Sequence, residues 1–181
     1  MALLIVQPTL IRLGRVTQHR KLGWLGVGLA IGVAGMGILV AVVAFAPPEG
    51  PTSPLKDLES LGVTLFGIVM FSLLVGFAVA CRHHAQYHKR FMLLATVNLL
   101  QAAVTRIPLD LIAIGGSVGT FLLADVFILP LVVWDVCVLR RIHPATLWGG
   151  LAILVSLPLR LWLSETQLWL SLAGWTVGLV H

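Results

Sequence analysis

The stretch LGWLGVGLAIGVAGMGILVAVVAFA, residues 22–46, carries no charged side chain over 25 consecutive positions. At about 1.5 Å of rise per residue, a helix of this length crosses the ~30 Å hydrocarbon core of a bilayer with some tilt. The stretch therefore predicts a transmembrane helix.

The whole chain has the composition of an integral membrane protein. Of its 181 residues, 59% are hydrophobic and 10% are charged, and the mean hydropathy is +1.01. Soluble domains average roughly 45–50% apolar and about 25% charged residues. The length suffices for one membrane domain, residues 1–181, and leaves no room for a separate soluble domain.

We predict an all-α polytopic bundle of about five spans and a short terminal hydrophobic helix. The spans are expected at residues 22–46, 61–80, 88–106, 118–139 and 145–163, and the short helix at residues 166–181. That helix would measure roughly 24 Å, so its length leaves open whether it crosses the membrane. Residues 107–117 are expected at an interface, and residues 1–11 look like the tail of a longer helix.

The basic residues divide unequally between the two sides of this bundle. Nine of the twelve lie on one side, which we call the basic end: Arg12, Arg15, Arg20, Lys21, Arg82, Lys89, Arg90, Arg140 and Arg141. Only Lys56, Arg106 and Arg160 fall on the other side. The positive-inside rule therefore places the basic end in the cytoplasm. The net charge of +5 thus comes from basic residues beside apolar spans, where they set the topology and contact anionic lipid headgroups. We therefore expect no nucleic-acid partner.

Candidate ligands from four segments converge on the basic end. His19, His88, Asp135 and His143 lie at the expected span ends on that side. Imidazole and carboxylate are natural ligands for zinc or non-haem iron, which makes this set a candidate metal site. His88 and His143 are alternatively the expected axial pair of a b-type haem. The competing interpretation is that these side chains reach headgroups or cap helices, since no strict metal-binding motif is present.

Polar residues also occur inside the expected spans. Asn98, Gln101 and Thr105 form a stripe on one helix face, which indicates either contacts between helices or the lining of a pocket. Asp125 lies within the fourth span, and we expect Arg106 to be its partner in a structural ion pair. A proton-relay or transport role for Asp125 is the alternative.

The first span carries a strip of small residues. Gly28, Gly32 and Gly35 recur at helical spacing and would let a helix of a partner membrane protein approach closely. The alternative is that glycine is simply common in membrane helices.

The segments HKRFMLLATVNLLQAAVTR, residues 88–106, and RRIHPATLWGG, residues 140–150, resemble a family of uncharacterised bacterial multi-pass inner-membrane proteins. The resemblance covers roughly residues 10–170 and implies a location in the bacterial inner membrane. It brings no established activity. The motif positions that it marks are His19, Arg20, His88, Lys89, Arg90, Arg106, Asp135, His143 and Pro144.

Three functions follow as hypotheses. The leading one is a small membrane protein that holds a metal or haem at its cytoplasmic face in a redox or assembly role. The second is a structural or accessory membrane subunit without a cofactor. The third is a zinc-dependent membrane hydrolase, whose catalytic residues the sequence does not identify.

Overall fold

The computed structural model describes residues 2–44, 54–104, 119 and 121–178, and these residues form helices and turns without a strand. The elements are α1 (Ala2–Arg12), α2 (Val16–Ala44), α3 (Pro54–Ala80), α4 (Ala85–Val104), the 3-10 helix η1 (Val126–Ile128), α6 (Leu129–Leu139), α7 (Pro144–Ser164) and α8 (Gln167–Gly178). Residues 121–125 are also helical and lead into η1. The all-helical fold class is thus confirmed.

Within the part of the chain that the structure describes, four segments are long and apolar enough to cross a membrane. They are Val16–Val43, Glu59–Ala80, Phe121–Leu139 and Pro144–Ser164. α4 coincides with the predicted span 88–106 as far as residue 104 but is much less apolar than the other long helices. The predicted interfacial segment 107–117 lies outside the described residues.

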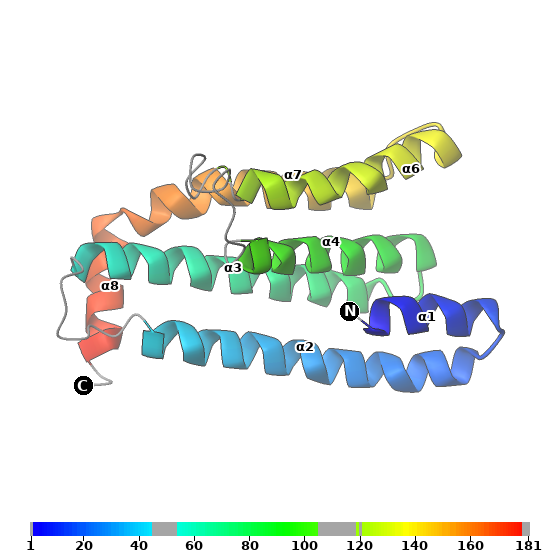
Figure 1. Cartoon of the computed structure of the whole chain (residues 1–181), viewed down its shortest axis with the longest axis horizontal. Coiled ribbons are helices and arrows are strands. Elements are labelled where there is room, and N and C mark those ends of the chain that lie inside the picture. Colours follow the sequence, from blue (N-terminus) through cyan, green and yellow to red (C-terminus); the bar gives the residue numbers. More distant parts are fainter. Residues whose placement is uncertain (1, 45–53, 105–118, 120, 179–181) are drawn as a thin grey trace.

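The long helices run side by side along one axis (Figure 1). α3 is the central element and packs against α2, α4, α7 and α8, while α4 also packs against α7. The turns after α1, α3 and α6 all lie at the same end of the bundle, which is the basic end (Figure 1). The sequence's expectation that distant basic segments meet at one end is therefore confirmed within the described residues.

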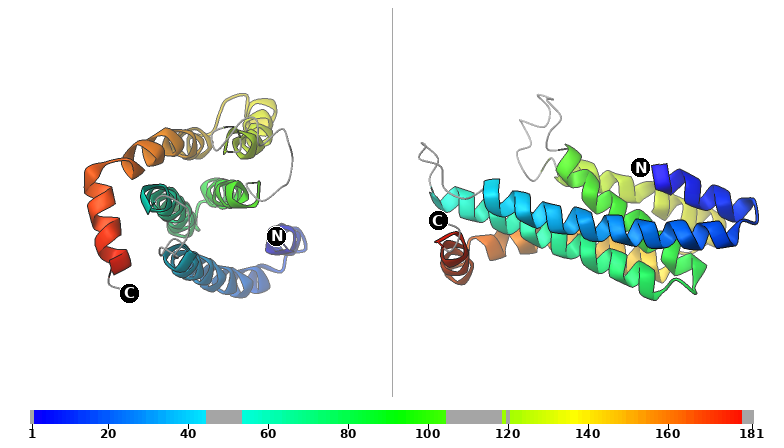
Figure 2. Two further views of the ribbon diagram at one scale, coloured as in Figure 1. Left: turned by 60° about the vertical axis from the view of Figure 1, so that its left-hand side comes forward. Right: turned by 90° about the horizontal axis from the view of Figure 1, so that it is seen from below.

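α1 is a separate helix and not an extension of α2. It ends at Arg12, and Gly14 turns the chain with a φ of +70°, a backbone conformation that glycine adopts at little cost. α1 then lies against α2 (Figure 2), where Gly26 leaves room for Leu3.

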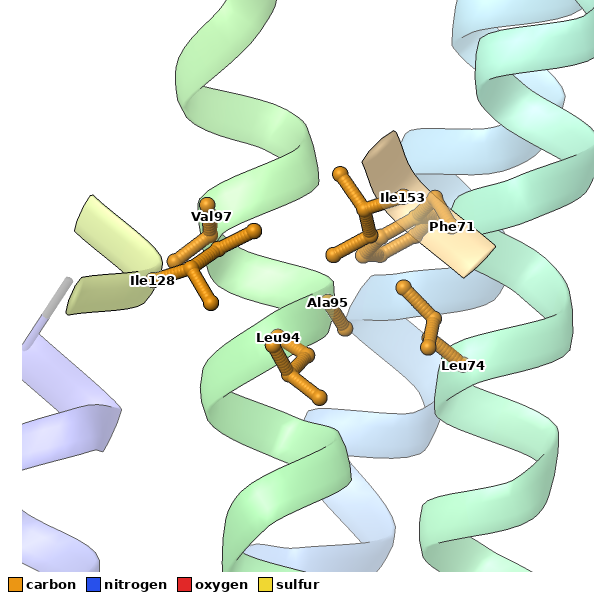
Figure 3. Close-up of a cluster of buried hydrophobic side chains, with 7 residues drawn as sticks. All are labelled: Phe71, Leu74, Leu94, Ala95, Val97, Ile128 and Ile153. Carbon is orange, nitrogen blue, oxygen red and sulfur yellow. The ribbon is translucent and has the colours of Figure 1, made fainter. Parts of the chain in front are cut away.

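An apolar core lies between α3, α4, α7 and η1 (Figure 3). Its buried members are Phe71, Leu74, Leu94, Ala95, Val97, Ile128 and Ile153. Gly149 of α7 brings this helix close to α4, because a Cβ atom added there would meet Leu94 Cδ1 at 2.5 Å. The core residues of α4 lie between Arg90 and Asn98 along the chain, so they separate two polar regions of that helix.

α8 lies across the end of the bundle opposite the basic end, roughly perpendicular to the long helices (Figures 1 and 2). Trp169 anchors it against α3, where the ring lies 5.4 Å from that of Phe66. Gly62 makes room for this contact, since an added Cβ atom would be 2.8 Å from Trp169 Nε1. The described part of the terminal helix therefore runs along the end of the bundle and not through it.

Candidate functional site

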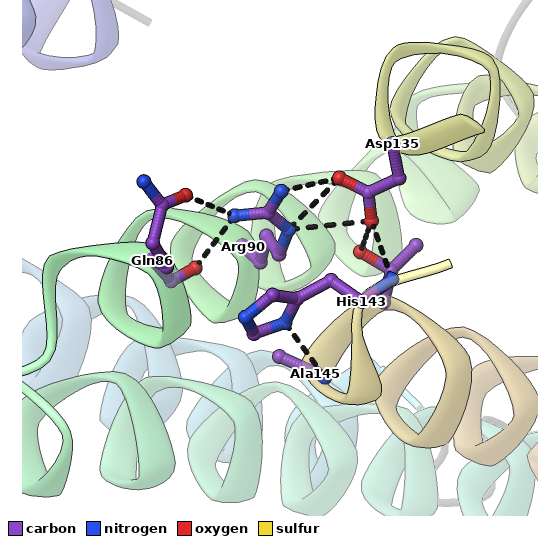
Figure 4. Close-up of polar contacts among 6 residues, drawn as sticks. Gln86, Arg90, Asp135, His143 and Ala145 are labelled. Atoms are coloured by element: carbon purple, nitrogen blue, oxygen red, sulfur yellow. Dashed lines mark hydrogen bonds and ion pairs between the residues drawn. The ribbon is translucent and has the colours of Figure 1, made fainter. Parts of the chain in front are cut away.

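Asp135 is the centre of a polar network at the basic end (Figure 4). Its side chain is fully buried, and it forms a salt bridge with Arg90. Arg90 Nε donates to both carboxylate oxygens at 3.1 and 3.3 Å. Asp135 Oδ2 also accepts from the backbone N–H of His143 at 3.1 Å and from Thr146 Oγ1 at 2.5 Å. One carboxylate therefore joins α6, α4 and the start of α7.

Arg90 is held on its other side by its own helix. The side chain is 1% exposed, and its Nη1 donates to the backbone oxygen of Gln86 at 3.0 Å and to Gln86 Oε1 at 2.6 Å. A buried guanidinium is costly unless its donors are paired, and here carboxylate and amide acceptors surround it. The geometry makes Arg90 and Asp135 a fixed connection between helices.

His143 caps α7 and does not present a free ligand atom toward Asp135. The residue has an extended backbone, and its Nδ1 accepts from the backbone N–H of Ala145 at 3.1 Å. A neutral imidazole that accepts at Nδ1 carries its proton at Nε2, so neither nitrogen offers a lone pair to a metal. Burial, followed by the positive charge of Arg90, lowers the pKa of His143, which favours this neutral form.

His88 has the opposite tautomer. Its Nδ1 lies 2.8 Å from the backbone oxygen of Ala78, so Nδ1 carries the proton and donates. This arrangement leaves Nε2 as the acceptor and is the one that metal-ligating histidines use. His19 of α2 lies beside Gln7 of α1. In the orientation that satisfies both ends of the Gln7 amide, its nitrogen donates to His19.

The metal site of His19, His88, Asp135 and His143 stays a prediction. No three His, Cys, Asp or Glu side chains of that part of the chain lie together as a group able to hold a metal ion. The reason is that Asp135 is engaged by Arg90 and Thr146, and the His143 ring is engaged in capping. Sequence reasoning brought Asp135 and His143 together, but the contact uses the backbone N–H of His143 and not its ring.

A second polar cluster lies farther along the bundle, between α4, α7 and the helical residues 121–125. Gln101 Nε2 donates to Asp125 Oδ1 at 3.0 Å, and Arg160 Nη1 donates to Gln101 Oε1 at 3.2 Å. Arg160 also donates to the backbone oxygen and the hydroxyl of Ser156 at 3.2 and 2.6 Å. The Arg160 guanidinium lies over the Phe121 ring, 5.4 Å from its centroid. Gln101 thus bridges an acid and a base that are both buried.

Within the described residues, Asp125 has partners that spacing along the sequence did not predict. Gln101 is its hydrogen-bond partner, and Arg160 is the positive charge that acts on it. Arg106 and Thr105 lie outside the described residues, so the ion pair of Arg106 with Asp125 stays a prediction. The predicted burial of Asn98 and Gln101 is confirmed, with exposed fractions of 5% and 2%.

Sequence reasoning missed the roles of Arg90, Thr146 and Arg160. A signal for Arg90 existed, because residues 90, 94, 98 and 101 follow the spacing of one helix face. The sequence marks Arg90 as a topology signal and as a motif position of the resembled family, and neither of these points to burial. The sequence places Arg160 on the far side of the bundle, and in the structure its guanidinium turns back into the bundle, so the residue is 3% exposed.

Comparisons with protein-family models, with curated proteins and with solved structures found no match.

Proposed function

We propose that this protein is a multi-pass inner-membrane protein with an accessory role, which holds a partner membrane protein through the exposed face of α2. The observation that carries the partner role is the surroundings of three glycines of this helix. A Cβ atom added at Gly28, Gly32 or Gly35 would meet no atom within 4 Å among the described neighbours. The same helix contacts α1 and α3 elsewhere, and Gly37 receives Ile68 of α3.

The occupant that suits this face is another transmembrane helix. Small residues at helical spacing allow two backbones to approach, and van der Waals contact drives association in lipid. The flanking side chains are large and apolar, including Leu29, Ile31 and Met36, each more than half exposed. A helix docked here would lie on an apolar surface with a shallow strip at its centre.

The polar clusters support an accessory role over a catalytic one. Arg90, Asp135 and Thr146 use their polar atoms to join helices to one another. The cofactor function stays a prediction, and His88 is the one candidate ligand whose tautomer suits it. The zinc-dependent hydrolase would need a water-activating metal, and the described residues contain no group of three or more His, Cys, Asp or Glu side chains that could hold one.

We further propose that α4 is a fifth span and that the basic end faces the cytoplasm. α4 packs on both α3 and α7, and its polar residues Arg90, Asn98 and Gln101 are buried against them. A helix shielded in this way does not need the apolar surface of a lipid-facing span. The gathering of turns with Arg and Lys at one end supports the orientation through the positive-inside rule. The resemblance to bacterial inner-membrane proteins supports the location.

The partner role is tested by cross-linking in native membranes, purification and mass spectrometry. The double variant Gly28→Leu/Gly32→Leu should lose a cross-linked membrane protein that the wild type retains. Gly76→Leu is the matched control, because Gly76 lies in α3 and a Cβ atom added there also meets nothing within 4 Å. Equal recovery of the partner from all three would contradict the proposal, and recovery of only a second copy of the chain would assign the face to self-association.

The competing cofactor function is tested on protein purified in mild detergent without a histidine tag. Visible absorption and elemental analysis should show neither haem nor stoichiometric zinc or iron if the role is accessory. A Soret band or near-stoichiometric metal that is lost in His88→Ala would replace this proposal.

A further inference from the structure

Two buried oxygens, one on α4 and one on the helical residues 121–125, lack a hydrogen-bond donor among the described residues. They are Asp125 Oδ2 and Asn98 Oδ1. Each residue is only 5% exposed. Asn98 uses its amide nitrogen to donate to the backbone oxygen of Gly67 at 3.0 Å, and Asp125 uses Oδ1 to accept from Gln101 at 3.0 Å. A buried acceptor without a donor is destabilising, so such atoms in a native protein call for a partner.

The positively charged member of the cluster, Arg160, already has its hydrogen-bond partners. Arg160 donates to Ser156 and to Gln101, in three contacts with described residues. Its guanidinium therefore reaches Asp125 only through the Gln101 bridge. Two opposite charges lie near each other without a direct hydrogen bond between them, and a carboxylate oxygen remains for another donor.

The charge balance decides what kind of donor fits. Asp125 and Arg160 lie within candidate spans, and their formal charges cancel. Adding a proton or a metal cation would leave a net positive charge inside the bundle, which is costly in lipid. A neutral molecule that donates hydrogen bonds satisfies the oxygens and keeps the sum of charges at zero.

We infer that Asp125 Oδ2 and Asn98 Oδ1 form a binding site for a small neutral hydrogen-bond donor, of which water is the smallest. The site is independent of the α2 surface and of the Arg90–Asp135 network. The two sites differ in the source of their hydrogen-bond donors. The Asp135 carboxylate accepts only from residues of the protein itself.

That difference provides an internal control for the test. The full chain, uniformly ¹³C- and ¹⁵N-labelled in lipid vesicles, is studied by solid-state NMR that follows magnetisation transfer from water to side-chain carbons. Transfer to the Asp125 carboxyl carbon is expected to be severalfold faster than transfer to that of Asp135, although both residues are buried. Asp125→Asn assigns the first signal, and sequential connectivity through Trp134 and Val136 assigns the second.

Variants of α4 locate the donor between the two oxygens. Asn98→Leu removes one acceptor and should slow the transfer from water to Asp125. Thr96→Val is the matched control, because Thr96 Oγ1 donates to Met92 within the same helix and takes no part in the cluster. Equally slow transfer to Asp125 and Asp135 in the wild type would overturn the inference. A carboxyl shift that shows Asp125 protonated near neutral pH would also overturn it, in favour of a proton site.

Glycerol distinguishes water from larger donors. A fall in transfer from water to Asp125 when glycerol is added would show that the site accepts small polyols as well. Unchanged transfer would assign the site to water.

Discussion

At the scale of single residues, the Arg90–Asp135 pair shows why a buried charge is held by several partners. Each group leaves water at a large cost, and only the combined contacts with Gln86, Thr146 and the His143 backbone offset it. Removing one member therefore affects all the others.

We expect Arg90→Ala to destabilise the protein by about 3–5 kcal/mol, because it leaves the Asp135 carboxylate buried and without its counter-charge. Unfolding in detergent micelles, followed by circular dichroism, measures the change. Arg141→Ala is the control, since Arg141 is exposed at the same end and its loss should change stability by less than about 0.5 kcal/mol. Removing Asp135 as well should recover part of the loss, and a double variant no more stable than Arg90→Ala would argue against a direct pair.

The histidine that caps α7 predicts a loss of stability in mild acid. Its pKa lies below the ordinary value of 6.5, mainly because of burial and then because of Arg90. The unfolded chain therefore binds a proton at a higher pH than the folded protein does, so folding stability falls as the pH drops below about 6.5 and stops falling below the folded-state pKa. Unfolding measured between pH 5 and 8 tests this.

His143→Asn serves as the control for that titration. Asparagine accepts hydrogen bonds at a helix N-terminus but has no group that titrates in this range. The variant should keep α7 capped and show a flatter dependence of stability on pH. An unchanged slope would place the titrating group elsewhere.

At the scale of elements, α4 and α7 approach each other closely at Gly149. Gly149→Ala should cost about 1–3 kcal/mol, since the new methyl group would meet Leu94, which has no exposed surface. Gly76→Ala provides the comparison, because its helical surroundings are open and alanine favours a helix over glycine. The thermal unfolding temperature should fall in Gly149→Ala and rise in Gly76→Ala. Equal shifts would mean that helix propensity alone determines both.

Helix positions were largely predictable from the sequence. The predicted spans 145–163 and 61–80 lie within α7 and α3, and the span 22–46 overlaps α2 as far as residue 44. Long uncharged stretches report on contact with lipid, which is the property that fixes these elements. The separate helix α1 was not predicted, because the turn at Gly14 is a local backbone feature that hydropathy does not register.

The polar partners were predictable only in part. Hydropathy and span counting brought Asp135 and His143 to one end, and helical spacing placed Asn98 and Gln101 on one face. Which base each acid meets depends on how the helices are rotated and shifted against one another. The pairing of Asp135 with Arg90, and the bridge from Asp125 to Arg160, follow from that packing and not from spacing along the chain.

At the scale of the whole molecule, the proposed five spans predict that the turn after α3 and the turn before α8 face opposite sides of the membrane. Single cysteines at His83 and Leu168, in a chain without Cys81 and Cys137, test this with a membrane-impermeant maleimide. We expect His83→Cys to react only in inverted vesicles and Leu168→Cys only in spheroplasts, since both positions are exposed. Reaction of both from the same side would contradict a crossing of the membrane by α4.

The apolar core between the two polar clusters has an electrical consequence. Leu94, Ala95 and Val97 lie on α4 between Arg90 and Asn98, and Ile153 and Phe71 close the layer from the neighbouring helices. An apolar layer has a low dielectric constant, so in the proposed topology much of a transmembrane voltage falls across it. Carrying one elementary charge through the full voltage costs about 2.3 kcal/mol per 100 mV. Because the formal charges within each cluster sum to zero, a voltage across this layer does almost no net work on either cluster as a whole.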